Sequence, residues 1–320
     1  MNMIVTPGHP HFNVHKRNYH EIEQDIHYVV QGRYCLQRIK PDVGVIAQLE
    51  FPNLITNIGM DSIGANVFTL SAVHVGTGTA TPAITDTSLQ TFGVGFNSSA
   101  TQSGANAGSP DYYVRRTYSW TSTIGGATGN WTEIGVSNQV ATGNLRSRAL
   151  ILDGGGSPTS FTVLADEQLK VFYLFDVYPL LTDDTRTVSI SGVDYNTVTR
   201  GFGIQGYHAG SFSATPSSVA VGQLYSGNLV ANVSATPSGP LGNASVAGGT
   251  YTSGNYFREF SLTYPPGTAT GTGRTLTVSN YYSTNSDVQI QYDKTSGGGG
   301  IVKSATQQLI LNVRRSWARR

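Results

Sequence analysis

The feature that most constrains the fold of this chain is a series of short segments in which apolar and polar residues alternate, separated by turn-forming residues. The segments with strand-like patterns are residues 43–51, 112–120, 131–137, 147–153, 160–165 and 169–178. Gly, Pro, Asn and Ser stand between them, and Gly alone contributes 38 of the 320 residues. Evenly spaced short strands of this kind are typical of sandwiches and barrels. The sequence therefore predicts an all-β protein.

The segment 169–178, LKVFYLFDVY, alternates most clearly. One face carries Leu169, Val171, Tyr173, Phe175 and Val177. The other face also carries large apolar side chains, at Phe172, Leu174 and Tyr178. A strand that is apolar on both faces is typical of the centre of a covered sheet. We therefore expect this strand to be central and covered on both sides.

One short helix is predicted, over residues 53–64. Asn53 can cap its N-terminus, and Gly64 can end it. Leu54, Ile58 and Ile63 would form the apolar face.

Residues 1–43 differ from the rest and predict an extended N-terminal docking arm. Five of the seven histidines lie there. Within the arm, residues 18–30 are compatible with a short helix, or with a strand laid on a neighbour. On a helix, Ile22, Ile26 and Val29 would share one face and form assembly contacts.

A metal site is the alternative interpretation of the arm. His9, His11 and His15 could supply imidazole ligands, with Glu21, Glu23 or Asp25 nearby. No Cys, HExxH motif or second His pair fixes a geometry, so we predict no metal and no cofactor.

An internal echo divides the rest into two related β-sandwich-like units, residues 44–182 and 183–320. YVRRTYSW from Tyr113 resembles YFREFSLTY from Tyr256, and aligning the two segments matches Arg115 with Arg258. Further matches, such as Leu169 with Leu309, recur at an offset of about 140 residues. Chance similarity between β-rich segments is the alternative.

The net charge bears on which partners are expected, and the cysteine content bears on the compartment in which the chain folds. The formal net charge is +1, which gives no overall basic field for nucleic acid or anionic lipid. The single Cys35 fits folding in a reducing cytosol, and the N-terminus lacks the apolar core of a signal peptide. The longest apolar run, 169–181, is too short to span a membrane.

Catalytic groups do not converge in the sequence. Outside the arm the histidines are His74 and His208, and neither lies in a nucleophile motif. The acid pairs Asp166–Glu167 and Asp183–Asp184 are sequence neighbours, which point to opposite faces of a strand. We therefore expect a protein that is not an enzyme.

The stretch HVGTGTATPAITDTSLQ, residues 74–90, looks like a phosphate-binding loop but lacks its lysine. The next lysine downstream is Lys170. Asp86 is expected to accept backbone amides in a turn.

Four segments in this order resemble virion proteins of tailed bacteriophages, described as tail, tail-fibre-associated or minor structural proteins. The segments are FPNLITNIGMDSIG, the Gly/Thr stretch above, NWTEIGVSN, and RALILDGGGSPTSFTVLADEQLKVFYLFDVYP. They cover about residues 50–180. The resemblance implies a non-enzymatic β-sandwich, present in many copies arranged by virion symmetry. It also implies that Gly76 and Gly78 allow tight turns after a strand ending near Val75, and that Pro82 fixes an extended connection.

From this resemblance we expect a virion protein made in the host cytoplasm, most simply a tail-associated adaptor, collar or fibre-attachment protein. Its partners would be copies of itself and other tail, portal or capsid proteins. A capsid decoration protein, or a module that binds a host receptor or surface glycan, are the alternatives. Arg314 and Arg315, in the terminal segment VRRSWARR, are expected to pair with acids of a neighbouring subunit.

Overall fold

The computed structural model confirms the all-β prediction. It describes residues 24–65, 68–97, 99–106, 113–179, 182–190, 192–201, 222–231, 235–279 and 286–320. Within these ranges almost every regular element is a strand, and α1 (Asn57–Gly64) is the one helix.

The largest sheet has eight strands and joins the two ends of the sequence. Its order is β17-β18-β23-β1-β12-β7-β6, and β2 pairs with the far part of β1. The strands are β1 (Gln24–Lys40), β2 (Gly44–Pro52), β6 (Ser99–Asn106), β7 (Tyr113–Thr121), β12 (Gln168–Pro179), β17 (Ser245–Gly248), β18 (Phe257–Tyr264) and β23 (Leu309–Arg319).

Smaller sheets complete the two sandwiches. A five-stranded sheet has the order β3 (Leu54–Ile55), β10 (Leu145–Leu150), β9 (Glu133–Ser137), β4 (Ala72–Gly76), β5 (Phe92–Phe96). A six-stranded sheet has the order β13 (Asp184–Ile190), β14 (Val193–Gly201), β21 (Ser286–Lys294), β20 (Thr275–Ser279), β15 (Gly222–Tyr225), β16 (Pro240–Asn243). Two ribbons pair β8 (Gly129–Trp131) with β11 (Phe161–Val163), and β19 (Gly271–Gly273) with β22 (Ile301–Lys303).

The two halves repeat the same nested pairing. In the first unit, β1 to β12, strand β7 pairs with β12, β8 with β11 and β9 with β10. In the second unit, β13 to β23, strand β18 pairs with β23, β19 with β22 and β20 with β21. Each ribbon passes from the large sheet to a smaller one, as in a jelly roll. The fold therefore contains the same ribbon twice.

The register also repeats, with one correction to the echo. The pair Tyr118↔Tyr173 corresponds to Phe260↔Val313. Arg258 then corresponds to Arg116 and not to Arg115, because each of them lies two residues before the matched aromatic residue on its strand. The sequence comparison was one residue out of register at this point.

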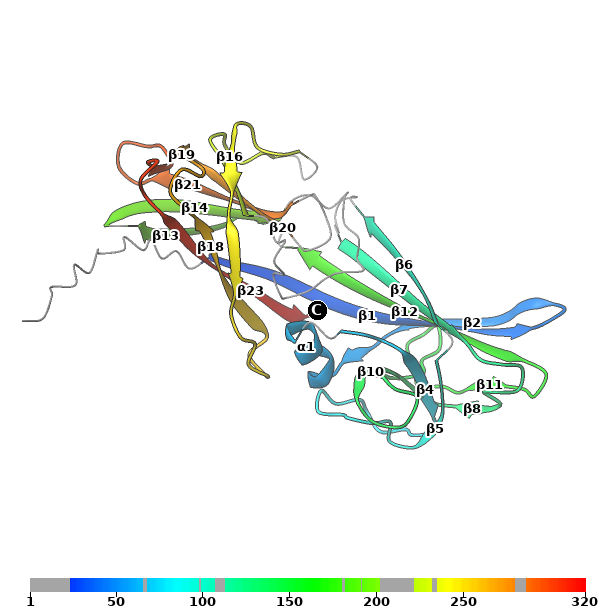
Figure 1. The fold of residues 1–320 in the computed structure, drawn as a ribbon. Coiled ribbons are helices and arrows are strands. Elements are labelled where there is room, and N and C mark those ends of the chain that lie inside the picture. Colours follow the sequence, from blue (N-terminus) through cyan, green and yellow to red (C-terminus); the bar gives the residue numbers. More distant parts are fainter. Residues whose placement is uncertain are drawn as a thin grey trace, which may run out of the picture.

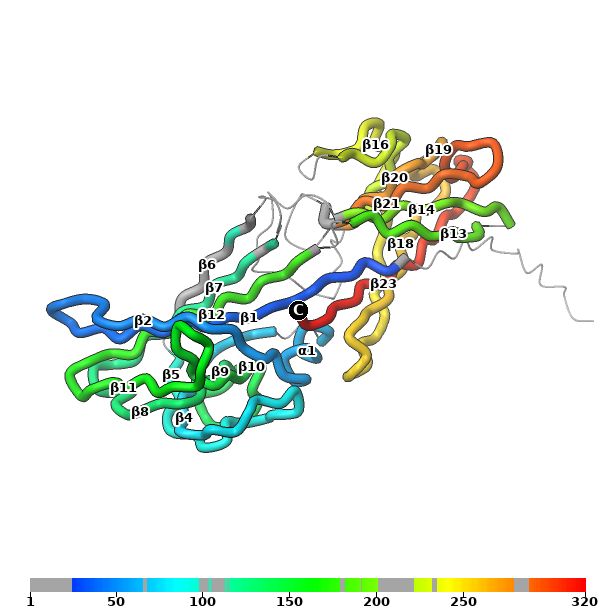
Figure 2. The backbone as a smooth tube through the Cα atoms, turned by 180° about the vertical axis from the view of Figure 1, so that it is seen from behind, coloured from blue at the N-terminus to red at the C-terminus, as the bar shows by residue number. Residues whose placement is uncertain are grey.

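Strand β1 joins the two units. It runs antiparallel to β12 and parallel to β23, which are the equivalent strands of the two ribbons. The units are therefore related by an approximate two-fold axis perpendicular to the large sheet, near β1. Figure 1 shows β1 in blue running from the second unit to a projecting hairpin with β2, and Figure 2 shows the same arrangement from behind.

The predicted docking arm is wrong from Gln24 onward, because β1 is a central strand. Ile26, Tyr28 and Val30 are buried on one face, whereas the residues between them are half-buried. Ile26 and Val29 thus lie on opposite faces, and Ile22 lies outside the described residues. The predicted division at 182/183 falls between β12 and β13, and the eight-stranded sheet contains strands from both sides of it.

The helix begins later than predicted. Thr56, not Asn53, caps α1, and its hydroxyl accepts a hydrogen bond from the Gly59 amide. The preceding Leu54–Ile55 forms β3 against β10, which keeps the chain extended. Gly64 is the last helical residue.

Strand β12 is central, between β1 and β7, as predicted. Its odd-numbered residues from Leu169 to Val177 are buried. On the opposite face Phe172, Leu174 and Tyr178 are half-buried. The expectation of full cover on both sides is therefore wrong for this second face.

Candidate interaction surface

The Gly/Thr loop closes around a buried carboxylate and not around a phosphate. Glu133 Oε1 accepts hydrogen bonds from the amides of Gly78 (2.9 Å) and Thr91 (2.7 Å). Its Oε2 accepts from the amide of Gln90 at 3.1 Å. The loop amides are already paired, those of Gly78 and Gln90 with Glu133 and those of Thr79 and Ala80 with Gln90 Oε1.

The two loop glycines are required by close approach. A Cβ on Gly76 would lie 2.3 Å from the carbonyl oxygen of Thr91, and one on Gly78 would lie 2.3 Å from Glu133 Oε1. Neither glycine has a positive φ. Glycine is thus required at Gly76 by the Thr91 carbonyl and at Gly78 by the Glu133 carboxylate, and not by a left-handed turn.

Arg148 completes this buried cluster. Its guanidinium contacts Glu133 Oε2 at 2.8 Å and Asp86 Oδ2 at 2.7 Å, and it donates to the carbonyl of Ala80 at 3.0 Å. Asp86 also accepts the Ala83 amide at 2.8 Å, which is the turn contact predicted from the sequence. Pro82 lies in the irregular segment between these contacts.

The described titratable groups that the sequence offered as catalytic candidates do not lie together, because each contacts a different partner. His74 is buried, its Nε2 lies 2.8 Å from the carbonyl oxygen of Gln139, and burial lowers its pKa. His208 lies outside the described residues. The acid pairs form separate ion pairs: Asp166 with Lys40, Glu167 with Arg38, Asp183 with Arg200 and Asp184 with Arg186.

No metal-binding group was found in the part of the chain that the structure describes. There, no three His, Cys, Asp or Glu side chains are placed to hold an ion. His9, His11 and His15 lie outside it. Likewise, no described helix has the length and apolar character needed to cross a membrane.

The outer face of the large sheet, opposite the two cores, carries charged and aromatic side chains. Near β7 and β12 the buried Asp176 binds Arg115 through two bonds of 2.6 and 2.7 Å, and Arg33 lies 3.7 Å away. The Arg115 guanidinium lies over the Tyr113 ring, whose centroid is 5.6 Å from that of Tyr178. Arg and Tyr are enriched where protein surfaces bind each other.

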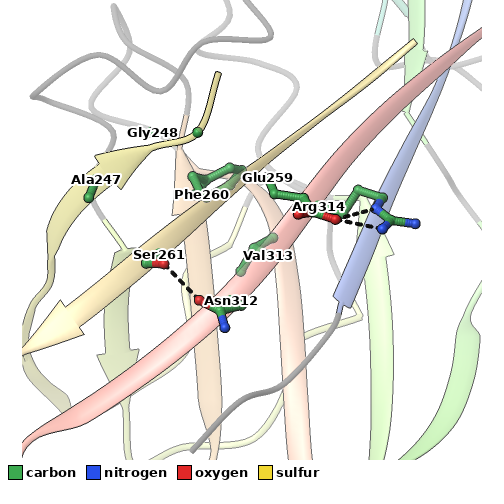
Figure 3. A pocket seen from close by; sticks show the side chains of 9 residues that line it. Ala247, Gly248, Glu259, Phe260, Ser261, Asn312, Val313 and Arg314 are labelled. Atoms are coloured by element: carbon green, nitrogen blue, oxygen red, sulfur yellow. Dashed lines mark hydrogen bonds and ion pairs between the residues drawn. The ribbon is translucent and has the colours of Figure 1, made fainter. Parts of the chain in front are cut away.

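A groove opens on the same outer face in the second unit (Figure 3). It is a cavity of about 380 Å³ lined by β17, β18 and β23. Ser261 donates a hydrogen bond to the Asn312 side chain at 2.7 Å, and Arg314 pairs with Glu259 at 2.5 Å. The dashed lines in Figure 3 mark these two contacts. Sequence reasoning found Arg314 but missed the other three side chains.

The residues predicted to form assembly contacts lie partly on the outer face of the large sheet and partly in the core. Arg314 lies on the outer face, where a neighbouring chain can reach it, and Val29 is half-buried on that face. Ile26 is in the core. Arg315 is fully buried, with its guanidinium 5.6 Å from the Phe260 ring centroid. The expectation for Arg315 is wrong because the alternation of β23 turns it inward.

The two units are fixed together where α1 meets the loop between β17 and β18, which we call the junction. Asp61 accepts hydrogen bonds from Tyr251 Oη (2.6 Å), Ser253 Oγ (2.6 Å) and the Gly254 amide (2.7 Å). Arg319 donates to the carbonyl of Ile55 at 2.6 Å. These bonds link residues between 190 and 264 positions apart.

The junction is expected to loosen in acid. Burial by itself raises the pKa of Asp61, but the bonds from Ser253, Tyr251 and Gly254, with the charge of Arg319, outweigh it and lower the pKa. A carboxyl whose pKa is lower when folded stabilises fully above its unfolded pKa of about 3.9, and loses that effect as the pH falls from there through its folded pKa. The Gly254 amide should therefore begin to lose protection from hydrogen exchange below about pH 4 and lose more as the pH falls further.

Asp61→Ala should remove the protection of the Gly254 amide already at pH 6. Asp166→Asn, which breaks the exposed pair with Lys40, should leave that protection unchanged. Equal protection of Gly254 at pH 6 and pH 3, after correction for intrinsic exchange, contradicts this assignment.

Comparisons with known proteins add no relative. No protein-family model, no curated protein and no solved structure matches the chain.

Proposed function

We propose that the chain is a structural protein of a tailed-bacteriophage virion, a tail-associated adaptor, collar or fibre-attachment piece. The observation that carries this proposal is the shared strand β1, which makes two sandwich units one continuous sheet. The junction at Asp61 joins the two units at a second place. Two units held together at more than one place suit a protein that connects two separated surfaces.

The distribution of apolar side chains supports a role in assembly. At the far end of the first unit, the projecting β1–β2 hairpin exposes Val43 and Val45, and the adjoining turns expose Ile124 and Leu164. The hairpin is tied to these turns by the Lys40–Asp166 pair at 2.8 Å. Exposed apolar side chains gathered at one place often mark protein contacts.

Copy number in purified virions tests the proposal. Quantitative mass spectrometry should find tens of copies or fewer per particle, as expected of a tail component. Hundreds of copies would favour the alternative, a capsid decoration protein. Absence from purified particles would contradict both virion roles.

A further inference from the structure

Strand β17 is the terminal strand of the large sheet among the strands that the structure describes. The Gly249 amide donates to the Glu259 carbonyl at 2.8 Å, so Gly249 faces Glu259 in a hydrogen-bonded pair. Such pairs alternate with non-bonded pairs along an antiparallel ladder. By the register, Val246 and Gly248 are therefore in non-bonded pairs, and their N–H and C=O groups point away from β18.

This edge is short, at four residues, but it carries no bulge, charged residue or proline. Strand β2, another terminal strand, has a register shift opposite Arg38/Ile39, and it carries Glu50 and Pro52. Bulges, charges and proline all discourage pairing at an edge. The β17 ladder has no register shift, and the strand consists of Ser245, Val246, Ala247 and Gly248. It is open to another strand.

The groove lies beside this edge and leads to a charged group. Ala247 and Gly249 offer little side chain, so nothing on β17 stands between the edge and Glu259 on β18. An added strand would lie about two strand spacings, roughly 10 Å, from β18. A long side chain from that strand can cover this distance over Gly249.

Glu259 presents a negative atom to such a side chain. Both bonds from Arg314 go to the same oxygen, Oε1, at 3.1 and 2.5 Å. Among the described residues no hydrogen bond reaches Oε2, and the Glu259 side chain is 55% exposed. Arg314 already offsets the charge of Glu259, but the exposed Oε2 can still accept a hydrogen bond from a second cationic side chain.

We propose that β17 binds an extended segment of a partner protein by strand addition, and that a lysine or arginine of this segment pairs with Glu259. Backbone bonds to Val246 and Gly248 would supply affinity, and the groove would select the basic side chain. The inference rests on the proposed assembly function, because it names the kind of segment that the assembly protein would take.

Titration of the purified, isotope-labelled full chain with short peptides tests this. The probe is acetyl-Thr-Lys-Thr-Val-Thr-Lys-Thr-amide, and the matched peptide carries Glu in place of Lys. The lysine peptide should shift the amide signals of Val246 and Gly248 and slow their hydrogen exchange. It should bind at least about ten-fold more tightly than the glutamate peptide.

Glu259→Gln should weaken binding of the lysine peptide by up to about five-fold. Glu50→Gln is the matched control, because Glu50 is similarly exposed, at 45%, and is also paired with an arginine. It should leave the affinity unchanged.

Three results overturn the proposal. They are equal binding of both peptides, equal binding by wild type and Glu259→Gln, or shifts that leave Val246 and Gly248 unaffected. If no peptide binds and the chain binds a glycan array in a way that Glu259→Gln weakens, the groove is assigned to a saccharide instead. Because these assays use no virions, their failure is distinguishable from failure of the copy-number test.

Discussion

Glu133→Ala should cost roughly 3–5 kcal/mol of unfolding free energy, because it leaves a buried charge without its principal partner. Arg148, 3% exposed, would keep only the partly exposed Asp86 as an ionic contact. The amides of Gly78, Gln90 and Thr91 would also lose their acceptor. Urea denaturation followed by circular dichroism measures the loss.

Two controls separate the sources of this effect. Arg148→Met should cost less than Glu133→Ala, because the remaining carboxylate still accepts three amide bonds. Glu50→Ala breaks an exposed pair with Arg33 and should cost at most about 1 kcal/mol. A Glu133→Ala loss no larger than that of Glu50→Ala would refute the buried cluster as a stabilising element.

Strands could be predicted from the sequence where apolar residues alternate along a single segment. Residues 169–178 alternate over their whole length, and β12 occupies Gln168–Pro179. The position of β1 was not predictable in this way, because the spacing of Ile22, Ile26 and Val29 also fits a helix. Its true partners lie far along the chain: His27 contacts Ser316, 289 positions away. Nothing local in the sequence records such a pairing.

The sequence echo carried more information than its matches alone. Matching Arg115 to Arg258 was off by one residue, yet the segments that it relates, β7 and β18, do occupy equivalent places in the two ribbons. The shared use of β1 could not follow from it, because one strand serves both units.

The cluster of Glu133 and Arg148 could have been predicted from the sequence, but the glycine-rich loop drew attention to phosphate binding instead. Glu133 begins β9 and Arg148 lies within β10, two strands in which nearly every residue is buried, and charged residues at such positions are seldom buried without a partner. The groove had no comparable signal, since Glu259, Ser261 and Asn312 are ordinary polar residues of an alternating strand. Only the three-dimensional arrangement of β17, β18 and β23 brings them together.

Trp317→Ala should cost roughly 3–5 kcal/mol and separate the unfolding of the two units. Trp317, on β23, is 2% exposed, and its indole N–H donates to the Met60 carbonyl of α1 at 3.1 Å. Its ring also lies 5.8 Å from that of Tyr251, which binds Asp61. The side chain thus belongs to the junction, and its removal should turn one calorimetric transition into two.

Trp131→Ala gives the matched control, because Trp131 is also buried but its N–H donates within the first unit, to Ala127 at 2.8 Å. That variant should lose stability while keeping one transition, since the junction is intact. Trp317→Phe retains most of the packing and should cost only about 1–2 kcal/mol, also with one transition. If Trp317→Ala still unfolds in a single transition, β1 alone couples the units, and the contacts of α1 with the second unit are not needed for their cooperativity.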